Sequence, residues 1–274
     1  MLICGYISLM NTILIISPNN SHKNLDAKDN IPTMPISGYT EIKLNSMPKI
    51  VEKLNAENSK ITSFSCEDIT AKVRRNNFSA KIQGRIYYEK PTNFRFILKS
   101  IMGLELDLGS NSQVFWYWSR RDGEPGLHFA KHEDLGKTRL KASFNPMIML
   151  GSLGINEIKF TENMSYYETG DLFVLRERTI SKSTRQKVIN TIFINKTMNK
   201  IVAFYVHDGI TNKLIGTNQL KYINNILSEI SYSSPEENSG MTLIFSNPKV
   251  NSKIDEKMWV MPDDSKKIDM GKGL

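Results

Sequence analysis

Cysteine is scarce in this chain. Cys4 and Cys66 are the only two among 274 residues. Cys4 lies in an apolar N-terminal stretch, so the folded part of the protein is expected to contain a single thiol. One thiol can form neither an internal disulfide nor a cysteine-based zinc site. We expect Cys66, on a predicted strand, to be a small buried hydrophobic residue rather than a reactive thiol.

Catalytic and nucleotide-binding signatures are missing too. The sequence contains no GxGxxG, GxxxxGK[ST], GxSxG or HExxH motif. His128 and His132 are four residues apart, but their segment is patterned as strand and turn, where this spacing does not pair metal ligands. Glu133 and Asp134 follow His132, yet we interpret this cluster as a solvated turn because catalysis also needs a nucleophile or a metal nearby. We predict that the protein is not an enzyme and has no cofactor and no metal site.

Dense basic runs are absent, although the net charge is +8 and the isoelectric point is about 9.3. The positive balance favours an acidic partner, such as an anionic lipid surface or an acidic protein. The lysines and arginines are scattered, and the aromatic residues form no recognisable RNA- or DNA-binding signature. Nucleic acid is therefore not an expected partner.

The N-terminal stretch is the longest apolar run. Residues 2–16 are fewer than the roughly 20 that a transmembrane helix needs, and they match the apolar part of an export signal. No Lys or Arg precedes them, so either the start site lies further upstream or the run is a membrane anchor. We expect residues 1–17 to be a signal or anchor and residues 18–44 a disordered linker. The protein is then exported, to the periplasm or tethered in the cell envelope.

The remaining pattern is mainly that of strands. One helix is predicted over residues 45–60, because Met47, Ile50, Val51 and Leu54 form a single apolar stripe. Apolar residues then alternate with polar ones at a period of two, as in antiparallel strands with one wet face. We expect strands at residues 69–73, 80–88, 94–99, 104–108, 115–118, 158–162, 171–180, 186–195, 200–207, 213–223, 226–232 and 241–245. These strands suit one large, strongly curved antiparallel sheet.

The aromatic residues concentrate in residues 91–135, which include two of the three tryptophans. Phe115 and Tyr117 are expected on one face of their strand, and Trp116 and Trp118 on the other. Because both faces are aromatic, one of them must be covered by a helix, a loop or a ligand. The concave face of the sheet is expected to be apolar. The acidic residues Glu105 and Asp107 share a strand face, and we expect them to keep it in contact with water.

A second short helix is predicted where the strand pattern is interrupted, at residues 143–154. Its apolar residues, which include Met147 and Leu150, lie nearly all round the helix. Such a helix is either a buried plug in the core or a lid that moves, and both hold if the plug fills an empty cavity.

Several motifs taken in order resemble a known family. An apolar signal, a polar linker and one helix precede YEKPTNFRFILKSIMGLELDLGSN, then FWYW, then FNPMIMLGSLG. This order is similar to the LolA/LolB-type lipoprotein-carrier superfamily, including LolA-like exported proteins with a GSN-x-x-FW-aromatic-W motif. The resemblance covers residues 45–260 and is strongest from residue 90 to 155. It implies a single unclosed antiparallel β-barrel of about eleven strands over one or two short helices, with an apolar cavity that shields acyl chains.

The resemblance also implies a membrane-contact loop in the receptor branch of that family. Residues 100–104 occupy the corresponding turn, which makes Ile101 and Met102 its apolar tip. The alternative is that both side chains are buried in the core. An anchored receptor and a soluble carrier both remain open, because the signal lacks basic residues and Cys4, which follows Ile3, is poorly placed for acylation.

The leading hypothesis is a binding or carrier protein for lipidated proteins or lipids. It would be a monomer that contacts a membrane surface, with a domain over residues 45–262 and a polar tail over 263–274. The alternative is an envelope-stress sensory or regulatory module of the same fold that binds a protein partner. The residues expected to line the apolar cavity are Ile82, Ile86, Phe94, Phe96, Leu106, Phe115, Tyr117, Met147 and Leu150.

Overall fold

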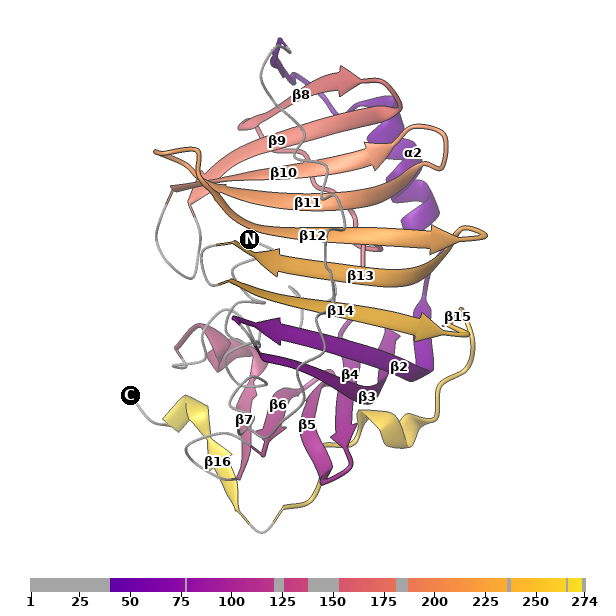
Figure 1. The fold of residues 1–274 in the computed structure, drawn as a ribbon, viewed down its shortest axis with the longest axis vertical. Helices are drawn as coiled ribbons and strands as arrows, with labels where there is room; N and C mark the ends of the chain where they lie inside the picture. Colours follow the sequence, from indigo (N-terminus) through magenta and orange to yellow (C-terminus); the bar gives the residue numbers. More distant parts are fainter. Residues whose placement is uncertain are drawn as a thin grey trace.

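One bent β-sheet forms the body of the protein (Figure 1). The computed structural model describes residues 40–76, 78–120, 126–137, 153–180, 187–235, 238–264 and 266–272. Within them the strands are β1 (Ile42–Lys43), β2 (Ser63–Arg75), β3 (Phe78–Glu89), β4 (Asn93–Ser100), β5 (Gly103–Ser110), β6 (Val114–Ser119), β7 (Leu127–Lys131), β8 (Met164–Thr169), β9 (Leu172–Ile180), β10 (Lys187–Asn195), β11 (Lys200–Asp208), β12 (Leu214–Ile223), β13 (Ile226–Ser234), β14 (Ser239–Ser246), β15 (Lys249–Val250) and β16 (Lys267–Asp269). The helices are α2 (Lys49–Ser59) and the 3-10 turns η1 (His132–Lys137), η3 (Glu256–Trp259) and η4 (Met270–Lys272).

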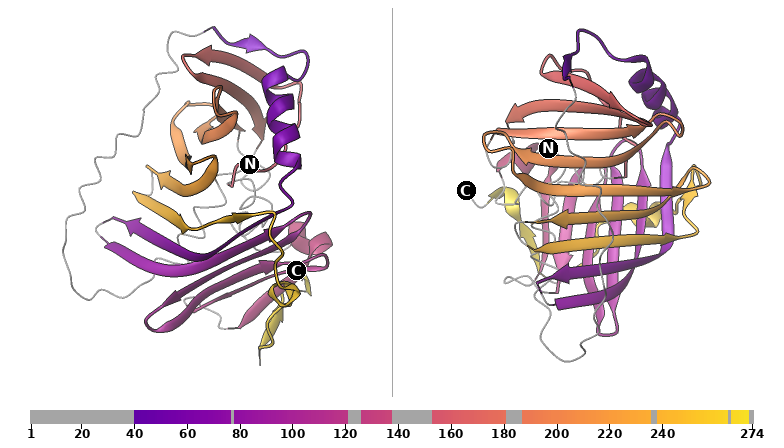
Figure 2. Two further views of the ribbon diagram at one scale, coloured as in Figure 1. Left: turned by 90° about the vertical axis from the view of Figure 1, so that its right-hand side faces the viewer. Right: turned by 45° about the horizontal axis from the view of Figure 1, so that its top comes forward.

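The sheet order joins two runs of consecutive strands. It is β1, then β8 to β14, then β2 to β7, then β16, with β15 paired to β2 off this path. The junction is the antiparallel pair β14–β2, which runs from Ser239 opposite Arg75 to Ser246 opposite Asp68. The end strands β1 and β16 are not neighbours, so the barrel is unclosed, as predicted. Figure 2 shows the two runs bent toward each other, with α2 along one side of the interior.

The predicted number of strands is wrong. In the described residues the sheet has sixteen strands rather than about eleven. Eleven predicted strands correspond to β2–β6 and β9–β14, but the strand expected at residues 158–162 is instead β8, which begins at Met164. Short strands such as β1 and β15 span two residues each, too few to show an alternating pattern. One α-helix is described, and the second predicted helix lies almost entirely outside the described residues.

The ordered sheet is also wider than the predicted domain of residues 45–262. Ile42 and Lys43 pair with Tyr166 and Ser165 of β8, ahead of the predicted start. Beyond the predicted end, residues Lys267–Asp269 run parallel to β7. Strand residues therefore lie in both the expected linker and the expected tail.

Asparagine makes the sharp turns. All eight non-glycine residues with positive φ in the described chain are asparagines. Asn224 and Asn225 stand between β12 and β13 with φ of 50° and 62°. Two successive residues at positive φ form the tight hairpin turn whose twist matches that of the strands, and asparagine tolerates this conformation better than other non-glycine residues.

The two faces of the sheet differ in their packing. On β2 the residues Ile69, Ala71 and Val73 are buried in the main hydrophobic cluster, which both runs of strands share. Phe193 and Tyr205 belong to a smaller cluster on the outer face of β8–β12. Because side chains alternate along a strand, the two clusters lie on opposite sides of the same strands.

The C-terminal segment lies against the outer face of β4 and β5. Arg95 donates to the Met258 carbonyl at 3.2 Å, and Asn111 donates to the Trp259 carbonyl at 3.0 Å. The neighbouring Trp116 is fully buried, with its ring over Gly109. On the outer face of the FWYW strand Trp116 is therefore buried, whereas Trp118 is half-buried.

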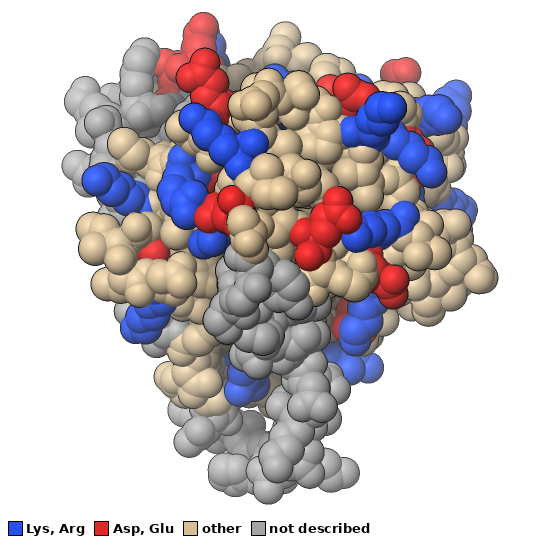
Figure 3. Space-filling view, turned by 90° about the horizontal axis from the view of Figure 1, so that it is seen from above, with Lys and Arg blue, Asp and Glu red and all other residues tan. Residues whose placement is uncertain are grey.

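Charged side chains on the side seen from above are of both signs. Figure 3 shows lysine and arginine lying beside aspartate and glutamate there. Among the nearby pairs, Lys196 Nζ lies 2.7 Å from Glu168 and Arg178 Nη1 lies 3.0 Å from Glu41. Lys196 and Arg178 are therefore each paired with an acid.

Candidate ligand-binding site

The predicted cavity residues come together on the inner face of β3–β6. All seven that the structure describes are buried in the main hydrophobic cluster, namely Ile82, Ile86, Phe94, Phe96, Leu106, Phe115 and Tyr117. Strand register aligns Ile86 with Phe96, Phe96 with Leu108, and Leu108 with Tyr117. This row places large apolar side chains side by side across four strands. Met147 and Leu150 lie outside the described residues.

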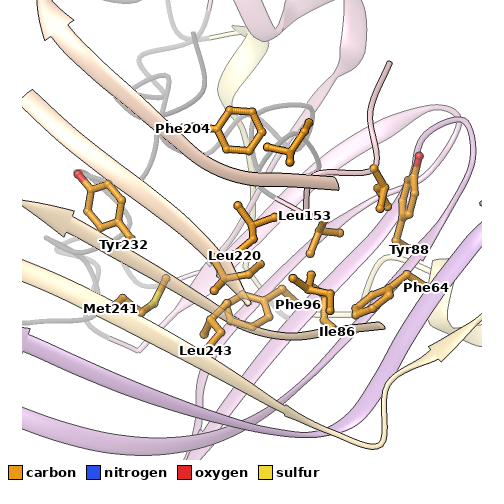
Figure 4. Close-up of a cluster of buried hydrophobic side chains, with 14 of the residues drawn as sticks. Phe64, Ile86, Tyr88, Phe96, Leu153, Phe204, Leu220, Tyr232, Met241 and Leu243 are labelled. Carbon is orange, nitrogen blue, oxygen red and sulfur yellow. The ribbon is translucent and has the colours of Figure 1, made fainter. Parts of the chain in front are cut away.

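The opposite wall comes from strands that the predicted cavity did not include. Figure 4 shows Phe204, Leu220 and Tyr232 from β11–β13 in the same cluster as Ile86 and Phe96. The sequence does show alternation in these later strands, but alternation does not tell which distant strand lies across the interior. The bend of the sheet decides which strands face each other.

A short segment enters the interior between the two walls. Leu153, Ile155 and Ile158 follow the undescribed part of the predicted second helix, and all three are buried in the main cluster. Figure 4 shows Leu153 among side chains from both walls. The end of the segment thus packs inside the fold.

Helix α2 holds this segment through two asparagines. Asn55 donates to the Ile158 carbonyl at 2.9 Å and accepts from the Ile158 amide at 2.9 Å. Asn58, which is buried, donates to the carbonyls of Gly154 and Asn156 at 3.1 and 3.2 Å. Each asparagine supplies the partners that a neighbouring strand would otherwise give to the segment's backbone. The sequence signal was weak: two polar residues, three apart, on the buried side of a predicted helix.

Three clefts open elsewhere on the surface. One, of about 540 Å³, lies where β1 and the start of α2 meet β8 and β9. The others, of about 350 and 410 Å³, adjoin Arg178 and Lys99. None of the predicted cavity residues lines these three clefts. In the described residues the inner apolar side chains bury one another, so a ligand would have to separate them.

The predicted membrane-contact residues are exposed. Ile101 is fully exposed and Met102 is 66% exposed at the tip of the β4–β5 hairpin. Arg120 braces the tip by donating to the carbonyls of Met102 at 2.6 Å and Leu104 at 2.9 Å. The Ser100 hydroxyl accepts from the Met102 amide at 3.0 Å and donates to Glu105 at 2.5 Å. Both apolar side chains therefore stand on a fixed turn in water, and the alternative that they pack in the core is wrong.

The thiol and the two histidines singled out in the sequence each contact neighbouring groups of the fold. Cys66 is buried, its thiol donates to the carbonyls of Asp68 and Ser246, and burial raises the pKa of the thiol. His128 stacks on Tyr117 with the ring centroids 4.7 Å apart. His132 Nε2 lies 2.6 Å from the Asn111 carbonyl oxygen. Across the described ranges no group of three His, Cys, Asp or Glu residues is placed to hold a metal ion.

Glu105 and Asp107 are buried rather than solvated, contrary to the expectation from their strand face. Asp107 accepts two hydrogen bonds from Arg95, at 3.1 and 2.7 Å. Glu105 lies 3.6 Å from the Arg120 guanidinium. Both carboxylates are therefore in ion pairs on the outer face.

Comparisons with known proteins found related folds. No protein-family model and no curated protein sequence matches the chain. In the described part of the chain, no helix is both long enough and apolar enough to pass through a membrane. A DUF1329 family protein from Desulfovibrio piger is similar in structure, with a TM-score of 0.50 and 10% identity over 77% of this chain and 94% of that one.

Two further structures carry descriptive names. A putative outer membrane lipoprotein-sorting protein domain from Vibrio parahaemolyticus is similar with a TM-score of 0.51 and 9% identity, over 77% of this chain and 94% of that one. A LolA superfamily protein from Nitrosomonas europaea has a TM-score of 0.48 and 13% identity, over 77% and 96%. The two likenesses at 0.50 and above show that the chain has the fold predicted by the resemblance. At such low identity they show the fold alone.

Proposed function

We propose that this protein is an envelope carrier that binds the acyl chains of lipids or lipidated proteins between the two walls of its bent sheet. The observation that carries the proposal is the inner face of β3–β6. Its aligned residues Ile86, Phe96, Leu108 and Tyr117 face a second apolar wall across the interior. The fold is shared with a protein described as a lipoprotein-sorting domain, which supports the same class of ligand.

The chemistry of this interior suits a hydrocarbon chain. Burying an acyl chain contributes about 0.8 kcal/mol for each methylene, so binding between the two walls would gain affinity with chain length and stay reversible. The buried carboxylates Glu105 and Asp107 belong to the outer face and do not interrupt the aligned inner row.

Entry of a ligand would use the segment of residues 153–158. Its side chains lie between the walls, and its backbone is attached to α2 through asparagine hydrogen bonds rather than through a strand ladder. Detaching this segment from α2 costs less free energy than detaching a whole strand, because fewer hydrogen bonds are broken. The segment would move aside as the acyl chain takes the place of Leu153.

The exposed hairpin tip supports a role at a membrane. Two large apolar side chains, Ile101 and Met102, are both exposed to water at the tip, and neighbouring exposed apolar side chains mark a site of interaction. Insertion of this tip would bring the carrier to the surface where acyl chains are collected or delivered.

The experiment is a titration with a fluorescent triacylated lipopeptide in the absence of vesicles. Wild-type protein is expected to bind it saturably. Phe96→Asp places a charge in the inner wall and is expected to weaken binding at least tenfold, whereas Thr70→Asp, on the outer face of β2, is the matched control and should leave it unchanged. Phe96→Ala, compared by circular dichroism and binding, separates loss of the site from loss of the fold.

Saturable binding that a folded Phe96→Asp protein retains in full would refute the proposal. So would a wild-type protein that binds no lipopeptide. A stable protein partner, recovered from membranes without lipid by native mass spectrometry, would instead support the regulatory alternative.

A further inference from the structure

The outer face of β2–β4 carries a group of basic side chains that the acyl-chain site does not use. Lys72 on β2, Lys81 and Arg85 on β3, and Lys99 on β4 form this basic face. Lys72 lies between the buried Ala71 and Val73, so alternation directs it away from the core. The three lysines are exposed, and the Arg85 side chain is 38% exposed.

Two of these lysines are placed where a sheet disfavours them. Lys72 and Lys81 are directly opposite each other in the antiparallel pair β2–β3. Like charges in directly opposed positions destabilise a sheet. Lys99 is opposite Gln83 on β3, two residues from Lys81. The sheet therefore gathers cations that would be better separated if stability alone decided.

Within the described chain, no acidic side chain forms a salt bridge with Lys72, Lys81 or Lys99. Arg85 has only a long contact of 3.8 Å to Glu67, whose side chain is 64% exposed. By contrast, Arg178 lies 3.0 Å from Glu41 and Lys196 lies 2.7 Å from Glu168. The basic face is thus available to an external anion.

A cleft of about 410 Å³ adjoins this face and leads to the hairpin tip. Arg85, Arg95 and Lys99 line it together with Gly103 and Leu104. Its volume lies in the range of about 300–1,000 Å³ that is typical of small-molecule sites. Arg95 is fixed by its two hydrogen bonds to Asp107, while Arg85 and Lys99 keep their charge for a ligand. The tip residues Ile101 and Met102 directly precede Gly103 at the rim.

We propose that the basic face and this cleft bind the anionic headgroups of a phospholipid membrane while the apolar tip inserts, so that the protein docks selectively on anionic bilayers. The inference rests on the proposed carrier function and adds the lipid class that the carrier recognises. Charge complementarity favours this occupant, because exposed cations and exposed apolar side chains occur on the β4–β5 hairpin and on the next two strands, β3 and β2. Each basic side chain near an anionic surface contributes about 1 kcal/mol, and salt screens the attraction.

The test is co-sedimentation of the full chain with phosphatidylcholine vesicles, with and without phosphatidylglycerol. Wild-type protein is expected to bind the anionic vesicles more tightly, and added salt should remove the difference. Neutralising each lysine should weaken anionic binding about fivefold, the change that about 1 kcal/mol corresponds to. The double variant Lys72→Gln/Lys81→Gln should therefore lose roughly 25-fold, and Lys99→Gln about fivefold.

Controls separate this face from net charge and from the tip. Lys53→Gln/Lys213→Gln removes the same charge at exposed positions on α2 and beside β12, and should change anionic binding little. Ile101→Ser/Met102→Ser should weaken binding to both kinds of vesicle. Equal binding of wild-type protein to both vesicles would overturn the inference, as would equal losses in the two lysine double variants. Binding of a short DNA duplex that depends on Lys72 and Lys81, with vesicle binding unchanged by their loss, would also overturn it.

The lipopeptide titration without vesicles keeps the two proposals apart. The basic-face variants should bind lipopeptide like the wild-type protein. If they do, but vesicle binding shows no anionic preference, the headgroup inference fails and the carrier stands. If anionic selectivity holds and no variant or wild-type protein binds lipopeptide, the carrier function fails, and the inference in the form that depends on it fails too.

Discussion

The side-chain amide of Asn55 forms two hydrogen bonds with the backbone of Ile158. It donates to the Ile158 carbonyl and accepts from the Ile158 amide, each at 2.9 Å. The two residues are 103 positions apart in the chain. This exchange imitates a strand pair, so one helical side chain supports the extended segment that enters the interior.

Asn55→Ala should weaken this attachment. It leaves the amide and the carbonyl of Ile158 without their partner, which costs about 1–3 kcal/mol in the free energy of unfolding where the groups are shielded from water. Urea denaturation measures the loss. Lys53→Ala is the control on the exposed side of the same helix, and it should be nearly neutral. If both variants unfold at the same urea concentration, Asn55 does not hold the segment.

His207 predicts a loss of stability on mild acidification. Burial, assisted by the Arg176 guanidinium, lowers the pKa of His207 below its usual 6.5. Near pH 6.5 His207 is protonated in the unfolded chain but stays neutral in the folded protein. The free energy of unfolding therefore falls as the pH drops through 6.5, and it levels off below the folded-state pKa. His207→Gln should remove this part of the pH dependence of urea denaturation. Superimposable pH slopes for the two proteins would exclude the effect.

Glu41 acts in the same direction at lower pH. Burial raises its pKa, but hydrogen bonds from Arg178 and Ser165 and the charge of Arg176 outweigh that effect, and the net pKa is lowered from 4.5. Its contribution is present above pH 4.5 and is lost as the pH falls toward the folded-state pKa. The window near pH 6.5 is therefore the one that reports on His207.

Gly109→Ala tests the packing of the FWYW strand. A Cβ at Gly109 would lie 2.1 Å from Cζ2 of Trp116, so the buried indole has to move. Overpacking of this kind costs about 1–3 kcal/mol. Gly170→Ala is the contrast, because nothing lies within 4 Å of its Cβ and only its φ of +49° opposes the change. The tryptophan fluorescence of Gly109→Ala should shift, and that of Gly170→Ala should not; an unshifted spectrum in both would contradict the packing.

The alternating patterns predicted the strands and the inner row of β3–β6 for a physical reason. A period of two fixes the face on which each side chain lies, so Phe94, Phe96 and Leu106 were assigned to the interior from the sequence. Alternation does not fix which strands lie opposite, and the wall that contains Phe204 and Leu220 depends on the bend of the whole sheet. Two-residue strands such as β1 show no period at all.

The alternating pattern also did not predict where the C-terminal segment packs. The sequence prediction assigned Met258 and Trp259 to the domain without saying what they contact, and their carbonyls accept hydrogen bonds from Arg95 and Asn111. Backbone carbonyls carry no sequence signature, so these contacts cannot be foreseen.

Asp107→Asn should be among the most destabilising single changes on the outer face. Arg95 donates twice to Asp107, and the two side chains are 14% and 7% exposed. Removing one partner of a buried ion pair leaves an uncompensated charge, which costs about 3–5 kcal/mol, whereas replacing both partners with apolar residues of similar volume is often neutral. The double variant Arg95→Met/Asp107→Leu should therefore recover most of the stability that Asp107→Asn loses, as measured by urea denaturation. Arg95 also donates to the Met258 carbonyl, so the double variant loses that hydrogen bond as well. Arg95→Met alone measures how much stability this loss costs. A double variant less stable than either single variant would mean that the pair itself, and not the avoidance of an unpaired charge, stabilises this face.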